Sequence, residues 1–156
     1  VAHCKSALEE AKGDLKKATE ILRKQGLEIA AKKQGRKALE GRIESYVHMG
    51  NKIGVLLEVN SETDFVAKNS DFVQFTRDVS MQIAACNPLY IAKEDVPKDV
   101  LKQEKDKELF YKNNSLLEQP FIKDPSITIK DYLGILVAKF NENIVIRRFI
   151  RYQIGS

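Results

Sequence analysis

Two carboxylates two positions apart, Glu62 and Asp64, are the first candidates for chemistry in this sequence. Paired carboxylates can serve as general acid and general base when a histidine, a metal set or a phosphate-binding loop accompanies them. No such group lies beside them, and the motifs HExxH, GxSxG and GxxxxGK followed by Ser or Thr do not occur. The usual requirements for hydrolysis and phosphoryl transfer are missing, so we predict a protein that is not an enzyme.

Cysteine and histidine are too sparse to indicate a metal site. Cys4 and Cys86 form no CxxC pair, which excludes a zinc ribbon and a disulfide scaffold. Reduced thiols in an intracellular protein are the ordinary interpretation. His48 precedes a turn, and a lone histidine is more often a surface residue than a ligand, because a metal site needs several ligands. We therefore expect no metal and no cofactor.

An aromatic residue lies in the polar segment that follows an apolar strand. Phe65 and Val66 stand between Asp64 and Lys68, where a turn is expected to carry polar residues. One interpretation is a helix start, in which Thr63 or Asp64 caps the helix and Phe65 folds back into the core. The other interpretation is an exposed acidic and aromatic tip that enters a partner protein. The pattern alone leaves both interpretations open.

Alternating apolar residues predict an antiparallel sheet that positions this segment. Residues 42–62 form a β-hairpin with its turn at 49–51, and residues 143–154 form a closing strand. We expect Arg147 and Arg148 to lie on opposite faces of that strand and to pair with carboxylates of the same domain. Arg148 is expected to share its face with a set of apolar residues. They are Ile144, Ile146, Ile150, Tyr152 and Ile154.

Three segments after the hairpin are predicted to be helical. Residues 69–86 form an amphipathic helix that ends at Asn87-Pro88, and residues 128–140 form another. Residues 97–112 are charged throughout and predict a surface helix. The apolar face of the first helix holds Phe72, Phe75, Val79, Ile83 and Cys86. The apolar face of the helix at 128–140 holds Ile129, Tyr132, Leu133, Leu136, Val137 and Phe140.

The N-terminal segment predicts a small helical module. Helices at 4–12 and 14–25 follow each other, with Asp14 as the N-cap of the second and Gly26 as its left-handed C-cap. The apolar stripe of such a pair needs a third helix to close its core. We therefore expect the natural protein to begin earlier, with the first helix of the module missing from this chain.

These elements together predict an α+β protein. We divide it into the helical module 1–26, a basic connector 27–41 and a core domain 42–156, in which helices cover an antiparallel sheet. No apolar run approaches the roughly 18 residues that cross a bilayer, and we expect no membrane partner.

The positive charge is concentrated near the N-terminus. Residues 1–42 hold 11 Lys/Arg and 6 Asp/Glu, which gives 11 − 6 = +5, and the remaining chain holds 15 and 16, which gives 15 − 16 = −1. A nucleic-acid module could use the connector as a phosphate patch, through Lys32, Lys33, Arg36 and Lys37. However, the chain has no tryptophan and no aromatic pair motif typical of RNA binding, so we expect no direct nucleic-acid contact.

The segment Glu58–Asn69 resembles the central motif of the elongation factor Ts family, which usually has cysteine in place of Ser61. Further segments resemble the family's motifs in the family's order, over nearly the whole chain. They are Cys4-Lys5, Ala7-Leu8, Gly13-Asp14, Ala18, Leu22-Arg23, Gly26, Ala30-Ala31-Lys32-Lys33, Arg36, Glu40-Gly41, residues 116–121, Glu142-Asn143-Ile144 and Arg147-Arg148-Phe149. Several separate motifs in one order make chance a poor explanation.

The resemblance implies a guanine-nucleotide exchange factor that binds elongation factor Tu in its GDP form and does no covalent chemistry. It implies that Asp64 and Phe65 enter between helices of the GTPase domain, near the magnesium site. The N-terminal module, which is UBA-like in the family, would hold another helix of that domain, and the core sheet would hold a different domain. The partner-binding residues that follow from the resemblance are Thr63, Asp64, Phe65, Val66, Val1, Ala2 and His48.

The chain also departs from the family pattern. It lacks the family's first helix and the Thr-Gly-Ala-Gly turn after it, it is short between Glu108 and Leu116, and it has one core module without a coiled-coil insertion. It resembles short cyanobacterial and plastid forms, so we expect the cytoplasm of a bacterium, or the matrix or stroma of an organelle. A homodimer or a 2:2 complex stays open. The alternative function is an RNA-binding or ubiquitin-like-binding module without exchange activity.

Overall fold

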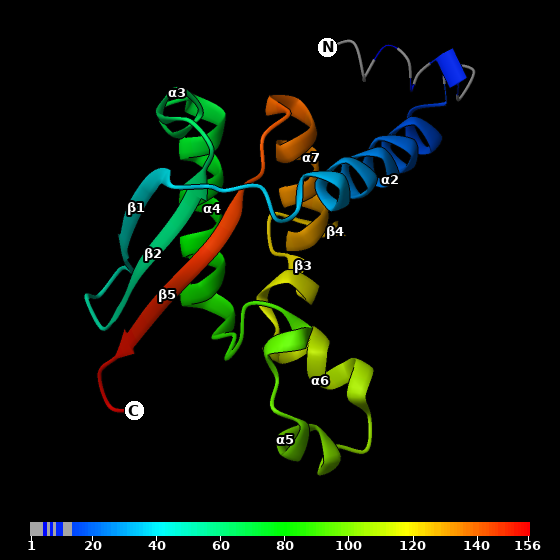
Figure 1. Cartoon of the computed structure of the whole chain (residues 1–156). Coiled ribbons are helices and arrows are strands. Elements are labelled where there is room, and N and C mark those ends of the chain that lie inside the picture. Colours follow the sequence, from blue (N-terminus) through cyan, green and yellow to red (C-terminus); the bar gives the residue numbers. More distant parts are fainter. Residues whose placement is uncertain (1–4, 6, 8, 11–13) are drawn as a thin grey trace.

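The protein is built around a three-stranded antiparallel sheet (Figure 1). The strands lie in the order β1 (Glu40–Val47), β2 (Ile53–Ser61) and β5 (Val145–Gln153), so the central strand is β2. A computed structural model provides this description for residues 14–156 and for residues 5, 7, 9 and 10.

Two helices complete the core. Helix α4 (Ser70–Cys86) covers one face of the sheet, and helix α7 (Ile129–Phe140) lies beside α4 (Figure 1). Helix α2 (Leu15–Lys33) crosses α7 on the side away from the sheet. The predicted α+β fold is confirmed, because helices cover one side of an antiparallel sheet.

The predicted hairpin at 42–62 is confirmed. Glu40 lies opposite Ser61, and the two strands stay in register to the turn. Gly50 and Asn51 make the turn with positive φ of 90° and 59°, a conformation that glycine and asparagine adopt at least cost. The core face of β2 holds Val55, Leu57 and Val59, each at most 5% exposed.

A β-bulge changes the side-chain pattern of β5. Glu58 lies opposite Arg148, but its neighbour Val59 lies opposite Ile146, so one residue of β5 has no partner. Because one extra residue turns every later side chain to the other face, Ile146 is buried whereas Ile150 is 44% exposed. The prediction that one face holds Ile144, Ile146, Ile150, Tyr152 and Ile154 is therefore wrong. The first two are buried and the last three are exposed.

The pairing that we expected for two arginines is confirmed for one of them. Arg148 donates from Nε to Glu58 Oε1 at 2.8 Å, across strands β2 and β5. Arg147 is exposed at the bulge, and no carboxylate pairs with it among residues 14–156. The Arg148 side chain is 77% exposed, so its ion pair adds little to stability.

Helix α4 supplies the centre of the core, as its spacing predicts. Four of its apolar side chains are fully buried, namely Phe72, Phe75, Val79 and Ile83. Asn69 caps the first turn, and Asn87 ends the helix in the left-handed region with φ of 48°. Cys86 was expected on the same face, but it is exposed, because the buried stripe ends at Ala84 and residues 85–87 are all exposed.

The predicted helix at 128–140 is also confirmed. Thr128 and Asp131 form a capping box: Thr128 Oγ1 accepts from Asp131 N at 3.1 Å, and Asp131 Oδ2 accepts from Thr128 N at 2.9 Å. The apolar face packs on the core through buried and partly buried side chains. They are Ile129, Leu136 and Val137, with Tyr132, Leu133 and Phe140 at the margin.

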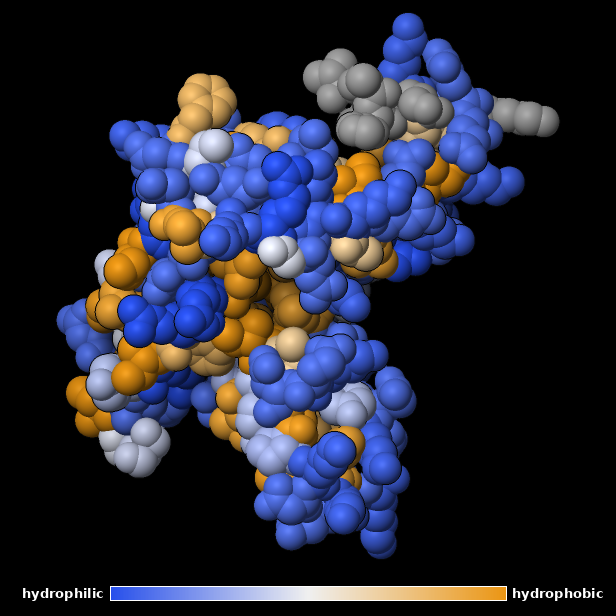
Figure 2. Space-filling model, in the orientation of Figure 1, coloured by the Kyte–Doolittle hydropathy of each residue, from blue (hydrophilic) through white to orange (hydrophobic). Residues whose placement is uncertain are grey.

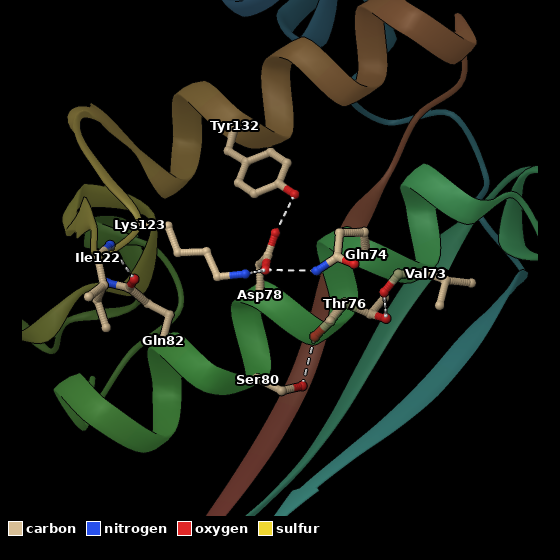
Figure 3. A network of polar contacts seen from close by, with 9 residues as sticks. All are labelled: Val73, Gln74, Thr76, Asp78, Ser80, Gln82, Ile122, Lys123 and Tyr132. Atoms are coloured by element: carbon tan, nitrogen blue, oxygen red, sulfur yellow. Dashed lines mark hydrogen bonds and ion pairs between the residues drawn. The ribbon is translucent and has the colours of Figure 1, made fainter.

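A polar network joins α4 to the segment before α7 (Figure 3). Asp78 accepts hydrogen bonds from Tyr132 Oη at 2.7 Å, Lys123 Nζ at 2.7 Å and Gln74 Nε2 at 3.0 Å. One turn later, Gln82 Oε1 accepts from the backbone N–H of Ile122 at 2.9 Å. These bonds fix a small hairpin that the sequence did not predict, β3 (Pro120–Phe121) and β4 (Asp124–Thr128).

We expect Tyr132→Phe to lower the free energy of unfolding by about 1.5 kcal/mol, because a hydrogen bond to a charged, buried group is lost. Hydrogen bonds to charged groups contribute about 1.5–3 kcal/mol. The loss should lie at the low end of this range, because Asp78 keeps its bonds to Lys123 and Gln74. A urea melt followed by circular dichroism measures it. Tyr152→Phe is the matched control, because the Tyr152 ring is 70% exposed. The free energy of unfolding of this variant should stay within about 0.5 kcal/mol of the wild type.

The contribution of Tyr132 to the free energy of unfolding should also depend on pH. Burial, and then the bond to Asp78, raise the pKa of Tyr132 well above the usual tyrosine value. A raised folded-state pKa means that the stabilisation is complete below the usual pKa and is lost as pH rises toward the folded-state pKa. Tyr132→Phe should therefore flatten the alkaline fall in stability. An alkaline fall as steep as that of the wild type would contradict this assignment.

Helix α2 continues well past its expected end. Asp14 caps it as predicted, accepting from the backbone N–H of Lys16 at 3.0 Å and of Lys17 at 3.2 Å. The helix then runs to Lys33, so the prediction that Gly26 is a left-handed C-cap is wrong. A Cβ at Gly26 would lie 2.9 Å from the backbone carbon of Gly134 in α7. The glycine is there because two helix backbones cross without room for a side chain.

The same helix occupies the first half of the connector predicted at 27–41. The segment between Lys33 and Glu40 is irregular and carries the chain from α2 to β1, which begins inside the predicted connector, at Glu40. The predicted helix at 4–12 lies largely outside the described residues.

The charged segment predicted as one surface helix at 97–112 contains two. Helix α5 (Lys98–Lys102) and helix α6 (Lys107–Asn114) bury no side chain, and Asp106 caps α6 by accepting from Leu109 N at 3.0 Å. Two short 3-10 helices, Lys93–Asp95 and Leu116–Glu118, flank this pair. Figure 1 shows α5 and α6 at the end of the molecule opposite to α3 (Asp64–Ala67).

Candidate functional site

The single-turn helix α3 (Asp64–Ala67) follows directly after strand β2 and forms one end of the molecule (Figure 1). Val66 and Ala67 are each 3% exposed and anchor the helix on the core. Phe65, between them and Asp64, is 81% exposed. Phe65 is therefore not a core staple, because only one side of so short a helix can face the core. We call the exposed part of this segment, Asp64 and Phe65, the tip.

Thr63 sets the start of α3 through its hydroxyl. Its Oγ1 accepts from the backbone N–H of Val66 at 3.3 Å, so Thr63 is the cap of the two residues, Thr63 and Asp64, that the sequence left open. The same hydroxyl donates to Glu142 Oε2 at 2.7 Å, and the Thr63 backbone N–H donates to Glu142 Oε1 at 3.1 Å. The backbone of the tip is thus held by a residue far away in the sequence.

Asp64 is exposed but has a cationic neighbour. Lys68 Nζ lies 2.8 Å from Asp64 Oδ2, one turn along the chain. The hydrogen bond to Asp64, and then the charge of that carboxylate, raise the pKa of Lys68. The lysine stays protonated at neutral pH, so the tip presents an aromatic ring beside an acidic group that is partly neutralised.

The remaining residues predicted for partner binding are dispersed. Val66 is buried, so it supports the tip and is not itself on the surface. His48 lies at the turn of the hairpin, where its Nδ1 is 2.9 Å from Tyr46 Oη. The pairing of β1 with β2 puts this turn at the other end of the strands, roughly 25 Å from the tip at the usual rise per residue. Val1 and Ala2 lie outside the described residues.

Leu39 is an exposed apolar residue near the tip that the sequence analysis did not select. It is 84% exposed and immediately precedes Glu40, which pairs with Ser61 at the start of the tip segment. Its neighbour Glu40 is close enough to the tip to contribute to the raised pKa of Lys68, the lysine that pairs with Asp64. The available signal was a leucine shortly after the basic and polar run at residues 32–37.

The outer face of the sheet, away from α4, carries further exposed apolar side chains. Figure 2 shows apolar surface gathered over the sheet, and mostly hydrophilic surface over α5 and α6. The exposed side chains are Ile43, Val47, Leu56, Ile150, Tyr152 and Ile154. Among the described residues no group of three or more His, Cys, Asp or Glu is placed to hold a metal ion.

The comparison with known proteins decides the family. The sequence matches the family model described as Elongation factor TS over residues 7–109. The elongation factor Ts of Carboxydothermus hydrogenoformans is 50% identical, in an alignment that covers 98% of this chain and 81% of that protein. The chain belongs to the elongation factor Ts family. The resemblance drawn from its motifs is confirmed.

Other relatives agree with this assignment. The elongation factor Ts of Caldanaerobacter subterraneus is 51% identical, over 98% of this chain and 88% of the relative. The elongation factor Ts of Moorella thermoacetica is 47% identical, over 98% of this chain and 87% of the relative. Membership of the elongation factor Ts family makes this chain a translation elongation factor. No described helix is both long enough and apolar enough to cross a membrane.

Proposed function

We propose that this protein binds elongation factor Tu in its GDP form and promotes the release of GDP. The observation that carries the proposal is the exposed Phe65 beside Asp64, on a helix anchored to the core, in a chain of the elongation factor Ts family. An aromatic ring left 81% exposed has an unfavourable contact with water that a partner's apolar pocket would relieve.

The mechanism needs no covalent step. The protein binds the conformation of the GTPase that holds nucleotide poorly, and by thermodynamic linkage GDP then weakens the binding of the protein by the same factor. The side chain of Phe65 acts as a wedge between helices of the GTPase domain, and Asp64 lies beside it near the magnesium site. Val66 anchors the wedge from inside the protein, and Thr63 fixes its first turn from the surface.

Contacts away from the tip supply the remaining affinity. In this proposal the N-terminal module grips a second helix of the GTPase domain through Val1 and Ala2. His48 and the outer face of the sheet meet a different domain of the GTPase. Two grips on two domains of the GTPase give the tip leverage, because both must be satisfied in the same complex.

The compartment and the assembly complete the proposal. We propose the cytoplasm of a bacterium, in line with the bacterial relatives, with the matrix or stroma of an organelle as the alternative. We expect no direct nucleic-acid contact, because the chain has no aromatic pair motif typical of RNA binding, and Arg36 of the basic connector also pairs with Glu62 at 2.9 Å. A homodimer or a 2:2 complex stays open.

We expect the protein to accelerate the release of labelled GDP from elongation factor Tu and to hydrolyse no nucleotide itself. The physical reason is that an exchange factor changes relative affinities and needs no phosphate-binding loop. The release rate is measured after adding excess unlabelled nucleotide, with and without the protein. Tight, stoichiometric binding of GTP or GDP to this protein alone would contradict the proposal.

A further inference from the structure

The tip is joined to two segments that are remote from it in the sequence. Glu62 Oε2 accepts from the backbone N–H of Asn143 at 2.6 Å, in the turn between α7 and β5. Glu142, in the same turn, binds both polar groups of Thr63. Each segment thus provides one carboxylate to the other, and this crossed arrangement resists rotation as well as separation.

The end of the connector closes the arrangement. Arg36 Nη2 lies 2.9 Å from Glu62 Oε1, and the Arg36 carbonyl accepts from Asn143 Nδ2 at 2.7 Å. Asn143 is 7% exposed, and the side chain of Glu62 is 15% exposed. The bonds of Asn143 are therefore shielded from competition with water. The Arg36 side chain, in contrast, is 52% exposed, and the bonds between Thr63 and Glu142 lie at the surface. We call the set Arg36, Glu62, Thr63, Glu142 and Asn143 the tip brace.

Glu142 has a specific effect on the cap of α3. A threonine hydroxyl has one hydrogen to donate and lone pairs to accept with. Because the hydrogen of Thr63 is donated to Glu142, a lone pair is directed to the backbone N–H of Val66. Without Glu142 the hydroxyl can rotate, and the first turn of α3 loses the bond that fixes its direction.

We infer that Glu142 is a positioning residue for nucleotide exchange, which acts through Thr63 on the direction in which Phe65 projects. This inference rests on the proposed function. A wedge transmits force only if its base is rigid, and the tip brace makes α3 one body with the sheet and α7. Glu142 itself need not touch the GTPase.

The test measures GDP release from elongation factor Tu, loaded with labelled GDP, under a range of excess concentrations of the full chain. A variant in which some chains are unfolded reaches the wild-type maximal rate at a higher concentration. A variant with a misdirected Phe65 has a lower maximal rate. We expect Glu142→Ala to lower the maximal rate about tenfold and to shift the half-saturating concentration less than threefold. A fall in maximal rate with nearly unchanged binding indicates an interaction that acts in the transition state of GDP release and not in the initial binding.

Three further variants make the assignment specific. Thr63→Val should lower the maximal rate like Glu142→Ala, whereas Thr63→Ser keeps the hydroxyl and should retain most of it. Asp106→Ala removes a helix cap far from the tip and should leave the maximal rate unchanged. Because Glu142 is argued to act through Phe65, the double variant Phe65→Ala with Glu142→Ala should be no slower than Phe65→Ala alone.

The outcomes are distinct. A wild-type protein that does not accelerate GDP release would overturn the proposed function. A wild-type protein that does, together with an unchanged maximal rate for Glu142→Ala or full additivity in the double variant, would overturn the positioning role alone. Amide hydrogen exchange of the isolated protein gives a readout without the partner: the backbone N–H groups of Thr63 and Val66 should lose protection in Glu142→Ala.

Discussion

Phe65→Ala is expected to slow GDP release from elongation factor Tu at least about tenfold, the equivalent of about 1.4 kcal/mol of lost coupling. The ring is 81% exposed in the free protein, so its only large apolar contact would be in the complex. For the same reason the free energy of unfolding should stay within about 1 kcal/mol of the wild type, as at other surface positions. A GDP-release rate and a urea melt on the same preparation measure both quantities.

Phe72→Ala is the matched control for that variant. Phe72 is fully buried on α4, seven residues after Phe65, and the same change should cost about 3–5 kcal/mol of stability because it leaves a cavity. Any loss of exchange should then follow the unfolded fraction. The wedge assignment fails if Phe65→Ala unfolds like Phe72→Ala, or if it releases GDP at the wild-type rate.

Gly26→Val is expected to lower the free energy of unfolding by about 3 kcal/mol and to loosen α2 from the core. A Cβ at this position would lie 2.9 Å from the backbone of Gly134 and 2.9 Å from the backbone nitrogen of Ile135. Backbone atoms cannot move aside as a flexible side chain can, so the two helices must separate, with a cost at the upper end of that for overpacking. Valine has a better helix propensity than glycine, but this gain is much smaller than the cost of separating the two helices.

Circular dichroism during urea unfolding measures the free energy of unfolding of Gly26→Val. Amide hydrogen exchange shows which elements lose protection. We expect protection to fall in α2 first while α4 and the sheet keep theirs, because α2 contacts the core mainly through α7. Gly54→Val is the matched control, since a Cβ there would approach only the carbonyl oxygen of Tyr46, at 4.0 Å. Wild-type stability and protection in Gly26→Val would show that the close helix crossing is dispensable.

Local sequence determined the elements whose pattern repeats along the chain. The stripe of Phe72, Phe75 and Val79 specifies α4, and alternation with a turn at Gly50 specifies the hairpin. Asp14 and Thr63 were identifiable as caps because a cap is made by a side chain and backbone groups only two or three residues away. The family followed from several short motifs in one order, which needs no three-dimensional information.

The tertiary structure alone decided what depends on contacts between remote segments. Gly26 fits a C-cap as well as a close helix crossing, and only the presence of Gly134 opposite it makes it the second. The face of Ile150 depended on a bulge set by the pairing of β5 with β2, which the alternation of β5 itself does not reveal. Phe65 could have been a staple or a tip, and the anchoring of Val66 left it outside the core. Glu142 and Asn143 meet Glu62 and Thr63 across about eighty positions of sequence, and no local pattern encodes a hydrogen bond between groups that only folding brings together.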